Sequence, residues 1–228
     1  MKTFVIIPAL NEERSIGLVI NALLPYNIAK IIVADNGSSD QTAKVAREAG
    51  AEVVFEQEKG YGAACLKALQ YAENFKPDIF LFMDGDFADD ANDIPKILEP
   101  IQTKKADLVI GSRVLGTREK GALTIPQIIG NALATRLLKL FFGVTYTDLG
   151  PFRAITKTAL DQIKMKDRNY GWTIEMQIKA AKHQLSYQEV PVNYRRRIGQ
   201  SKVSGTLKGS FLAGSIILYS IYKYGWSR

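Results

Sequence analysis

Two aspartates separated by one glycine, Asp84 and Asp86, directly follow an apolar run at residues 79–83. Such a run is typical of a buried parallel strand, on which side chains two residues apart point to the same side. At the carboxyl edge of an open α/β sheet, that side faces the ligand crevice. Paired carboxylates there suit Mg²⁺, which usually binds together with phosphates. The spacing therefore favours a metal–diphosphate site and a nucleotide-activated substrate over a solvated acidic turn.

Polar residues also follow the first two predicted strands, at residues 4–8 and 31–34. Turn and cap formation explains Asn11 well, but it does not explain why polar residues gather at several strand ends. The carboxyl ends of parallel strands share one edge of a sheet, so these residues together would build a crevice. A carboxylate there, such as Asp35, can accept the N–H of a uracil or guanine edge.

The strongest basic cluster is Arg195-Arg196-Arg197-Ile198-Gly199-Gln200-Ser201-Lys202. It is either a solvated face or a tight loop that closes guanidinium and ammonium groups over a diphosphate. The net charge of +7 is concentrated around it, since residues 164–228 carry 12 Lys/Arg against 3 Asp/Glu. This distribution indicates an anionic partner, either phosphates or an anionic membrane surface. No nucleic acid is expected, because no recognised module or aromatic-interleaved basic patch is obvious.

Other reactive residue types give weaker signals. Gly60-Tyr61-Gly62 begins like a dinucleotide fingerprint, but Cys65 stands at the sixth position, so close backbone packing is expected. Cys65 and His183 stand alone, which supports no Ser/His/Asp or Cys/His nucleophile system, and one cysteine fits a reducing compartment. Three more acidic residues are expected to form a solvated loop and a helix start: Asp89, Asp90 and Asp93.

The elements that would position these residues alternate along the first hundred residues. Strands are predicted at residues 4–8, 31–34, 52–55, 79–83 and 108–110. Helices are predicted between them, at residues 11–24, 38–49, 63–74 and 94–101. This alternation predicts an α/β fold with a mostly parallel, Rossmann-like sheet flanked by helices.

After residue 113 the pattern changes. A helix is predicted at residues 128–142 with a polar stripe of Asn131, Thr135 and Lys139, followed by a strand at 186–194 and a basic loop at 195–206. The tail at residues 209–222 has 14 uncharged residues, fewer than the ~20 that span a bilayer. Lys, Tyr and Trp at its ends suit an interfacial helix, and a core helix remains the alternative. No secretory signal is expected at the N-terminus, where an apolar stretch of the required length is missing.

Six segments together resemble the family 2 glycosyltransferases of the GT-A fold, in particular their polyprenyl-phosphate hexosyltransferase branch, the dolichol-phosphate mannose synthase type. They span almost the whole chain in the expected order: Ile6-Ile7-Pro8-Ala9-Leu10-Asn11-Glu12, Val33-Ala34-Asp35-Asn36-Gly37-Ser38-Ser39-Asp40, Asp84-Gly85-Asp86, Gly111-Ser112-Arg113, Thr147-Asp148-Leu149-Gly150-Pro151-Phe152-Arg153 and Arg197-Ile198-Gly199-Gln200-Ser201-Lys202. Asn36 stands where many relatives have a second Asp, and a second acceptor-phosphate Arg has no clear counterpart near Leu123.

The resemblance implies roles for these residues. The nucleoside would be held by Pro8, Ala9, Glu12 and Asp35. Asp84 and Asp86 would hold Mg²⁺ or Mn²⁺ on the diphosphate, aided by Arg197 and Lys202, and Arg113 would face the acceptor phosphate. The expected substrate-binding set is completed by Asn11, Arg153 and Ser201. Residues 1–206 would form the GT-A domain, with a donor half at 1–113 and an acceptor half at 114–206, and residues 207–228 an apolar C-terminal helix.

The predicted reaction is an inverting, metal-dependent transfer of a hexose from a UDP-sugar or GDP-mannose to a polyprenyl or dolichyl phosphate. A phosphate acceptor is already ionised and needs positioning more than a general base, so Asp86 and Arg113 would be the catalytic residues. The enzyme would be cytoplasmic and peripheral on the cytoplasmic face of the membrane.

A hydroxyl acceptor is the alternative, and it would need a base, for which Glu175 is the candidate. The other interpretation of Glu175 is a surface helix carboxylate paired with Lys179. A nucleotidyltransferase or a non-catalytic nucleotide-sugar sensor is a third class.

Overall fold

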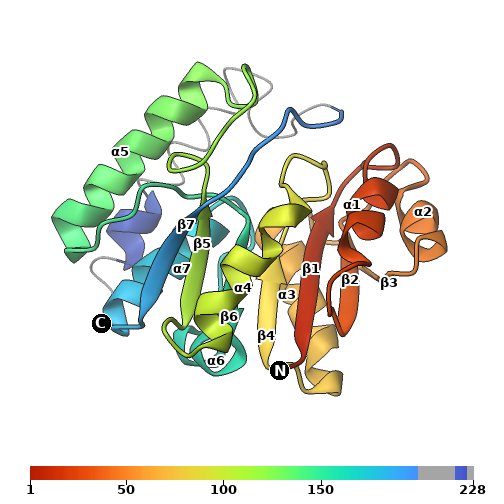
Figure 1. The fold of residues 1–228 in the computed structure, drawn as a ribbon, viewed down its shortest axis with the longest axis horizontal. Coiled ribbons are helices and arrows are strands. Elements are labelled where there is room, and N and C mark those ends of the chain that lie inside the picture. Colours follow the sequence, from red (N-terminus) through yellow and green to blue (C-terminus); the bar gives the residue numbers. More distant parts are fainter. Residues whose placement is uncertain (200–218, 225–228) are drawn as a thin grey trace.

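One seven-stranded sheet organises the chain, whose computed structural model describes residues 1–199 and 219–224 (Figure 1). The strand order is β3-β2-β1-β4-β6-β5-β7. Neighbouring strands are parallel except at β6, which runs antiparallel to β4 and β5. The strands are β1 (Thr3–Ala9), β2 (Lys30–Asp35), β3 (Glu52–Phe55), β4 (Ile79–Phe82), β5 (Leu108–Ser112), β6 (Arg153–Thr156) and β7 (Tyr187–Pro191). The predicted α/β fold with a mostly parallel sheet is confirmed.

Helices cover both faces of the sheet. One hydrophobic cluster joins the sheet to α1 (Ile16–Leu23), α2 (Thr42–Glu48) and α4 (Ile94–Gln102). A second cluster joins the opposite face to α3 (Tyr61–Ala72), α6 (Lys157–Ile163) and α7 (Trp172–Lys182). The long helix α5 (Ile125–Phe142) stands beyond the β7 edge and contributes to this second cluster (Figure 1). Two short 3₁₀ turns, η1 (Glu73–Phe75) and η2 (Ala91–Asp93), precede β4 and α4, respectively.

The late part of the chain departs from its predicted pattern. Strand β6 was not predicted. It has only four residues and begins with Arg153, so it shows no alternation of apolar and polar residues that would identify a strand. The strand predicted at residues 186–194 is shorter, because the chain leaves β5 after Pro191. Tyr194 then makes isolated bridges to Asp89 and Arg118, which brings the following basic residues back over the first half of the sheet.

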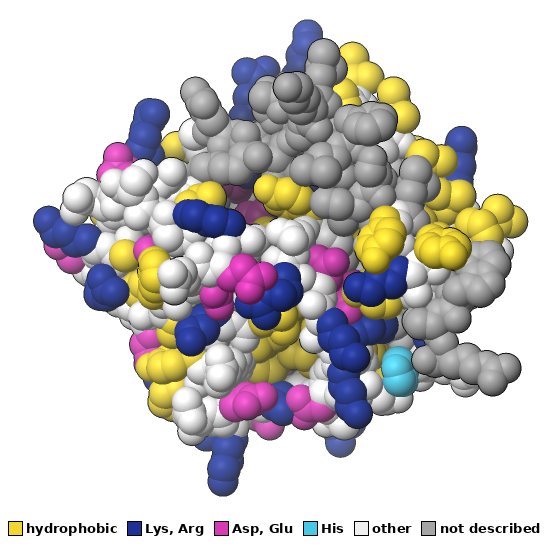
Figure 2. Space-filling model, turned by 180° about the vertical axis from the view of Figure 1, so that it is seen from behind, with side chains coloured by type: hydrophobic (Ala, Val, Ile, Leu, Met, Phe, Trp, Pro, Cys, Tyr) yellow, Lys and Arg dark blue, Asp and Glu magenta, His cyan; other side chains and the backbone are white. Residues whose placement is uncertain are grey.

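Helix α5 exposes much of its apolar surface. It begins at Ile125, three residues before the predicted start, because Thr124 and Gln127 form a reciprocal capping box. Ile125 and Leu140 are 72% and 74% exposed, respectively. Figure 2 shows hydrophobic side chains gathered along the right-hand side of the molecule, where α5 lies. The helix thus offers an uncovered apolar face within the described part of the chain.

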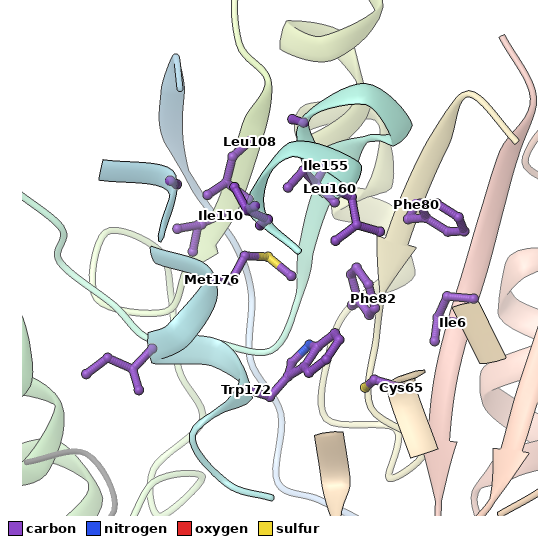
Figure 3. Close-up of a cluster of buried hydrophobic side chains, with 14 of the residues drawn as sticks. Ile6, Cys65, Phe80, Phe82, Leu108, Ile110, Ile155, Leu160, Trp172 and Met176 are labelled. Atoms are coloured by element: carbon purple, nitrogen blue, oxygen red, sulfur yellow. The ribbon is translucent and has the colours of Figure 1, made fainter. Parts of the chain in front are cut away.

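The core behind β4 is aromatic and closely packed. Phe82 from β4 and Trp172 from α7 pack with their ring centroids 5.9 Å apart (Figure 3). Cys65 lies in the same cluster, and burial raises the pKa of its thiol well above the ordinary value. Both observations fit the structural role expected for Cys65. The aromatic packing also holds the end of β4 in place, directly before Asp84 and Asp86.

The chain end is helical at residues 219–224. Ile221 and Tyr224 are buried in the cluster beside α7, whereas Tyr219 and Tyr222 are exposed. One face of residues 219–224 is therefore part of the core, as the alternative of a core helix predicted. The rest of the predicted apolar tail lies outside the described residues. Within residues 1–199 and 219–224, no helix has the length and apolar character needed to cross a bilayer.

Candidate active site

A cavity of about 230 Å³ opens where β1 and β4 end. It is lined by residues from several segments: Pro8, Ala9, Leu10, Glu12, Asn36, Lys59, Gly60, Tyr61, Ala64, Asp84, Gly85, Asp86, Asn169, Tyr170 and Arg197. We call this cavity the donor crevice, after the nucleotide-sugar donor that the sequence predicts for it. Six of the residues expected to bind the donor or a metal therefore meet in it: Pro8, Ala9, Glu12, Asp84, Asp86 and Arg197.

The two aspartates lie in a crowded acidic environment. Asp86 is only 1% exposed, and Asp84 accepts a hydrogen bond from the Tyr61 hydroxyl at 3.0 Å. Asp89 lies beside them: its Oδ2 accepts from the Asp84 backbone N–H, and its buried Oδ1 has no hydrogen-bond partner within the described residues. Burial and the neighbouring Asp86 raise the pKa of Asp84 to about 7. Burial and both neighbouring aspartates raise the pKa of Asp89 well above its usual range.

A bound cation would reduce the electrostatic repulsion among these neighbouring carboxylates. An orphaned buried carboxylate oxygen and two raised carboxyl pKa values show that negative charge is incompletely compensated here. In residues 1–199 and 219–224, however, no three Asp, Glu, His or Cys side chains converge into a complete metal site. The carboxylates fit a divalent cation that takes part of its ligand set from a bound diphosphate.

Arg197 neutralises part of the acidic charge. Its Nε donates to Asp86 Oδ2 at 2.9 Å, and its Nη2 donates to the same oxygen. The Ile198 N–H donates to the Asp86 carbonyl at 2.9 Å, so the backbone is fastened there as well. The structure thus brings Arg197 to the crevice as expected, whereas Ser201 and Lys202 lie outside the described residues.

The expectation that the acidic residues after Asp86 form a solvated loop is wrong. Asp89 and Asp93 are both 1% exposed. The returning chain covers this loop: the Asn193 N–H donates to Asp93 at 2.6 Å, and Arg195 forms a 2.6 Å ion pair with Asp90. Bonds across about one hundred residues of sequence explain why local patterns did not reveal this burial.

Two residues of the expected substrate-binding set, Asn11 and Asp35, hold turns and do not line the crevice. The Asn11 side-chain oxygen accepts from the Ser39 N–H at 2.8 Å, and Asp35 Oδ1 accepts from the Ser38 N–H at 3.0 Å. The turn interpretation given for Asn11 therefore fits its contacts. Asp35 ends β2, where it supports the loop beside the crevice.

Three crevice residues come from the segment between β2 and α3. The Asn36 amide accepts from the Gly60 N–H at 2.7 Å and donates to the Glu58 carbonyl at 2.6 Å. The Lys59 ammonium donates to the Asn36 and Gly37 carbonyls. Asn36 and the Gly60-Tyr61-Gly62 segment are not among the residues that the sequence predicts for the site. Their position after successive strands was the signal that could have included them.

Close packing explains the two glycines beside Tyr61. A Cβ atom on Gly60 would lie 2.0 Å from the Arg168 carbonyl oxygen, and one on Gly62 would lie 2.0 Å from the Asp167 carbonyl oxygen. The expected packing role is confirmed. The same contact brings Asn169 and Tyr170 to the crevice from a loop more than a hundred residues away, for which the sequence offered no signal.

Arg113 lies outside the crevice lining and is held by one carboxylate. Its backbone N–H and its Nε both donate to Asp148 Oδ2 at 2.8 Å, and its Nη2 donates to Oδ1 at 2.7 Å. The guanidinium lies over the Tyr194 ring, 5.0 Å from the centroid. Glu189 in β7 accepts hydrogen bonds from the Thr147 and Asp148 N–H groups and so fixes the backbone that carries the Asp148 carboxylate. Arg113 is a fixed, partly exposed cation.

Two more expected site residues have buried structural contacts. Arg153 donates to the Gly150 and Thr173 carbonyls, and burial lowers its pKa to about 10. Glu175 is 0% exposed, and its carboxylate accepts from the Lys166 and Asp167 N–H groups. The expected pair with Lys179 is present at 2.7 Å, but it is buried where a surface position was expected, because the 164–167 turn folds over it. Neither Arg153 nor Glu175 lines the crevice.

A paired-carboxylate crevice on this sheet agrees with the comparison with known families. The model of the family described as "Glycosyl transferase family 2" matches residues 4–164 of this chain. The chain belongs to this family. This family 2 glycosyltransferase is 35% identical over 212 residues to an uncharacterised glycosyltransferase of Mycobacterium tuberculosis, with 92% of this chain and 93% of the relative covered.

Other relatives of this glycosyltransferase have described activities. It is 30% identical over 210 residues to the UDP-N-acetylglucosamine–dolichyl-phosphate N-acetylglucosaminyltransferase of Methanococcus voltae, covering 83% of this chain and 84% of the relative. It is also 30% identical over 220 residues to the dolichyl-phosphate hexose transferase of Haloferax volcanii, covering 93% and 91%.

Solved structures confirm the GT-A fold. Glucosyl-3-phosphoglycerate synthase from Mycobacterium tuberculosis, in complex with Mn²⁺, UDP and phosphoglyceric acid, superposes with a TM-score of 0.79. The match covers 100% of this chain and 79% of that one at 22% identity. The same enzyme has been solved with Mg²⁺ and UDP, with a TM-score of 0.78, 22% identity and coverage of 98% and 79%. At this identity the likeness concerns the fold.

Proposed function

We propose that this glycosyltransferase transfers a hexose, with inversion, from a UDP-sugar or GDP-mannose to a polyprenyl or dolichyl phosphate. The observation that carries the proposal is the donor crevice, in which Asp84, Asp86 and Arg197 meet the end of β1. Residues 1–113 would supply most of the donor site and residues 114–206 the acceptor site, with residues 207–228 as an attached helix.

The crevice matches the chemistry of a nucleotide sugar. Pro8, Ala9 and Asn36 line the crevice together with the acidic pair, and a nucleoside would lie against them. Asp84 and Asp86 would hold Mg²⁺ or Mn²⁺, and the uncompensated charge around them supports that assignment. When bound, such a cation offsets charge on the leaving nucleoside diphosphate.

Arg197 would contribute a second positive charge to the diphosphate. It is bonded to Asp86, and its side chain also lines the crevice. A guanidinium in this position can exchange a carboxylate for a phosphate, because both offer paired oxygens to its planar donors. Arg197 would therefore bind the diphosphate as well as compensate Asp86.

A phosphate acceptor fits the groups around the crevice better than a hydroxyl acceptor does. A hydroxyl needs a general base within hydrogen-bond reach. The carboxylate of Glu175, the candidate base, already accepts two backbone N–H groups and pairs with Lys179. Arg113, by contrast, is oriented by Asp148 and keeps part of its side chain exposed. The dolichyl-phosphate enzymes among the relatives support the same choice.

The uncovered face of α5 supports an acceptor that resides in a membrane. Residues 120–147 contain no Asp or Glu, and the basic residues among them are Lys120, Arg136 and Lys139. Asn131 and Thr135 of the polar stripe turn inward, since Asn131 bonds to the Thr147 carbonyl and the Leu149 N–H and Thr135 is buried, so several apolar positions face outward together with the exposed Lys139. Basic charge around an exposed apolar face suits an anionic bilayer surface. The enzyme would thus be peripheral on the cytoplasmic face.

Incubation with labelled UDP- and GDP-sugars tests this function. With Mn²⁺ present, label should move to polyprenyl phosphate and not to soluble hydroxyl acceptors. Transfer to soluble acceptors alone would overturn the acceptor assignment. Release of pyrophosphate would indicate nucleotidyl transfer, and tight binding without turnover would indicate a sensor.

A further inference from the structure

We infer that Glu175 is a positioning residue for the donor crevice: it clamps the loop at residues 166–170, which in turn fixes the start of α3 and one wall of the crevice. The loop contributes Asn169 and Tyr170 to the lining. The identity of the ligand rests on the proposed function, whereas the clamp itself rests on contacts within the chain.

The clamp is a buried carboxylate whose backbone hydrogen bonds go to the loop and whose ion pair lies within its own helix, while the Tyr224 side chain interacts with it from the end of the chain. Glu175 accepts from the Lys166 N–H at 3.0 Å and from the Asp167 N–H at 2.7 Å. Lys179 pairs with the carboxylate at 2.7 Å and also donates to the Lys164 carbonyl. Glutamine at this position would keep one acceptor oxygen but would turn an NH₂ group toward a loop N–H. Because Glu175 is fully buried, water could not take the place of the lost acceptor.

The loop then serves as the N-terminal cap of α3. This helix begins after Gly60 with no side-chain cap. Instead, the Gly62 N–H donates to the Asn169 carbonyl at 3.2 Å, and the Ala63 N–H donates to the Arg168 carbonyl at 2.8 Å. The first N–H groups of a helix have no partner within the helix, so these loop carbonyls satisfy them. The lack of space for a Cβ on Gly60 or Gly62 shows how closely the two segments fit.

The start of α3 carries the contact to the metal-ligand candidates. Tyr61 is its first residue, and the Tyr61 hydroxyl lies 3.0 Å from Asp84 Oδ1. Explicit hydrogen bonds therefore connect Glu175 to the loop, the loop to α3, and α3 to Asp84. Displacement of the loop would move Tyr61 together with Asn169 and Tyr170, and both changes affect donor binding.

Two measurements on Glu175→Gln test the clamp. Hydrogen exchange should become faster at residues 166–170 and also at residues 61–63, across the contact. Calorimetry with UDP or GDP in the presence of Mn²⁺ should show a dissociation constant raised about tenfold for the nucleotide that the wild type binds. Asp167→Ala serves if the glutamine variant does not fold. Asp167 is partly exposed, and its side chain accepts a hydrogen bond from the Asn169 N–H, so this variant should also speed hydrogen exchange at residues 61–63 and 166–170 and weaken nucleotide binding.

Glu189→Gln is the matched control, since Glu189 also accepts backbone N–H groups, from Thr147 and Asp148, but does not line the crevice. It should leave nucleotide affinity and exchange at residues 61–63 unchanged. Unchanged exchange and affinity in Glu175→Gln would overturn the inference, as would equal weakening in Glu189→Gln. A collapse of kcat in Glu175→Gln with unchanged affinity would identify a general base. If the wild type binds neither nucleotide, the proposed donor fails, and exchange alone decides the clamp.

Discussion

Asp148→Asn tests how Arg113 is held. Asp148 is 1% exposed, and the paired Arg113 side chain is 13% exposed. The substitution keeps the size of the side chain and one acceptor oxygen, but it removes the charge that receives the three N–H donors of Arg113. The guanidinium would then remain partly buried without an ionic partner.

The expected loss of stability follows from this geometry. Removing one partner of a fully buried ion pair costs about 3–5 kcal/mol. Water reaches part of Arg113, and asparagine retains one acceptor, so the loss should fall at or below the lower limit of that range, at about 2–3 kcal/mol. For a chain of this size, that corresponds to a fall in Tm of roughly 4–12 °C.

Function should change on the acceptor side only. The KM for polyprenyl phosphate should rise by roughly 10- to 150-fold, the equivalent of a charge-assisted contact of about 1.5–3 kcal/mol. The affinity for the nucleotide should stay the same, because neither Arg113 nor Asp148 lines the donor crevice. Urea denaturation, a thermal scan and steady-state kinetics with saturating donor provide the three measurements.

Asp161→Asn is the control for loss of a carboxylate, because Asp161 is 57% exposed in its pair with Lys157 and should contribute less than about 1 kcal/mol. The reasoning about Asp148 would be refuted by a loss of stability no larger than that of the control. An unchanged acceptor KM would refute the role of Arg113, even if stability falls as expected.

Three further predictions concern the donor site and the membrane. Asp86→Asn should abolish most transfer activity and weaken Mn²⁺-dependent UDP or GDP binding in calorimetry, with secondary structure retained, because it removes a ligand without opening a cavity. Arg197→Gln should weaken nucleotide-sugar binding by about 1.5–3 kcal/mol, measured by calorimetry. Ile129→Glu combined with Leu140→Glu should reduce sedimentation with anionic vesicles, because it places charge on the exposed face of α5.

Each of these predictions has an outcome that contradicts it. Full activity of Asp86→Asn, or of the wild type in excess chelator, would rule out the metal assignment. Unchanged donor affinity in Arg197→Gln would mean that Arg197 serves only to neutralise Asp86. For the membrane face, Phe55→Glu is the control, since Phe55 is an exposed apolar residue on the edge strand β3, away from α5. Equal vesicle binding by the α5 variant and this control would show that α5 is not the membrane surface.

Local patterns determined the first half of the molecule, residues 1–113. The run ending at Asp84-Gly85-Asp86 is a fully buried strand, as its continuous apolar sequence predicted, and the pair emerges at the carboxyl edge. The alternation of strands and helices predicted the sheet, because each element carries its own periodicity and its connections are short. The ends of neighbouring parallel strands then had to meet, so Pro8, Ala9 and the two aspartates share one crevice.

Orientation along the acceptor side was decided by tertiary structure. The sequence predicted α5 and its polar stripe, but polar stripes usually face water. Here Asn131 and Thr135 face inward, because the loop at residues 147–149 has backbone groups that Asn131 satisfies. The antiparallel insertion of β6 between β4 and β5 is likewise a property of the assembled sheet.

Contacts between distant segments account for the rest. Arg197 meets Asp86 across 111 residues, and the loop carrying Asn169 and Tyr170 reaches the crevice because Gly60 and Gly62 leave no space between it and α3. Glu175 illustrates the difference most clearly: its helix position and its pair with Lys179 followed from spacing, but its complete burial and its bonds to the 166–167 backbone did not. Periodicity specifies which face of an element is apolar, whereas the partner of a buried polar group depends on how remote backbone segments pack against it.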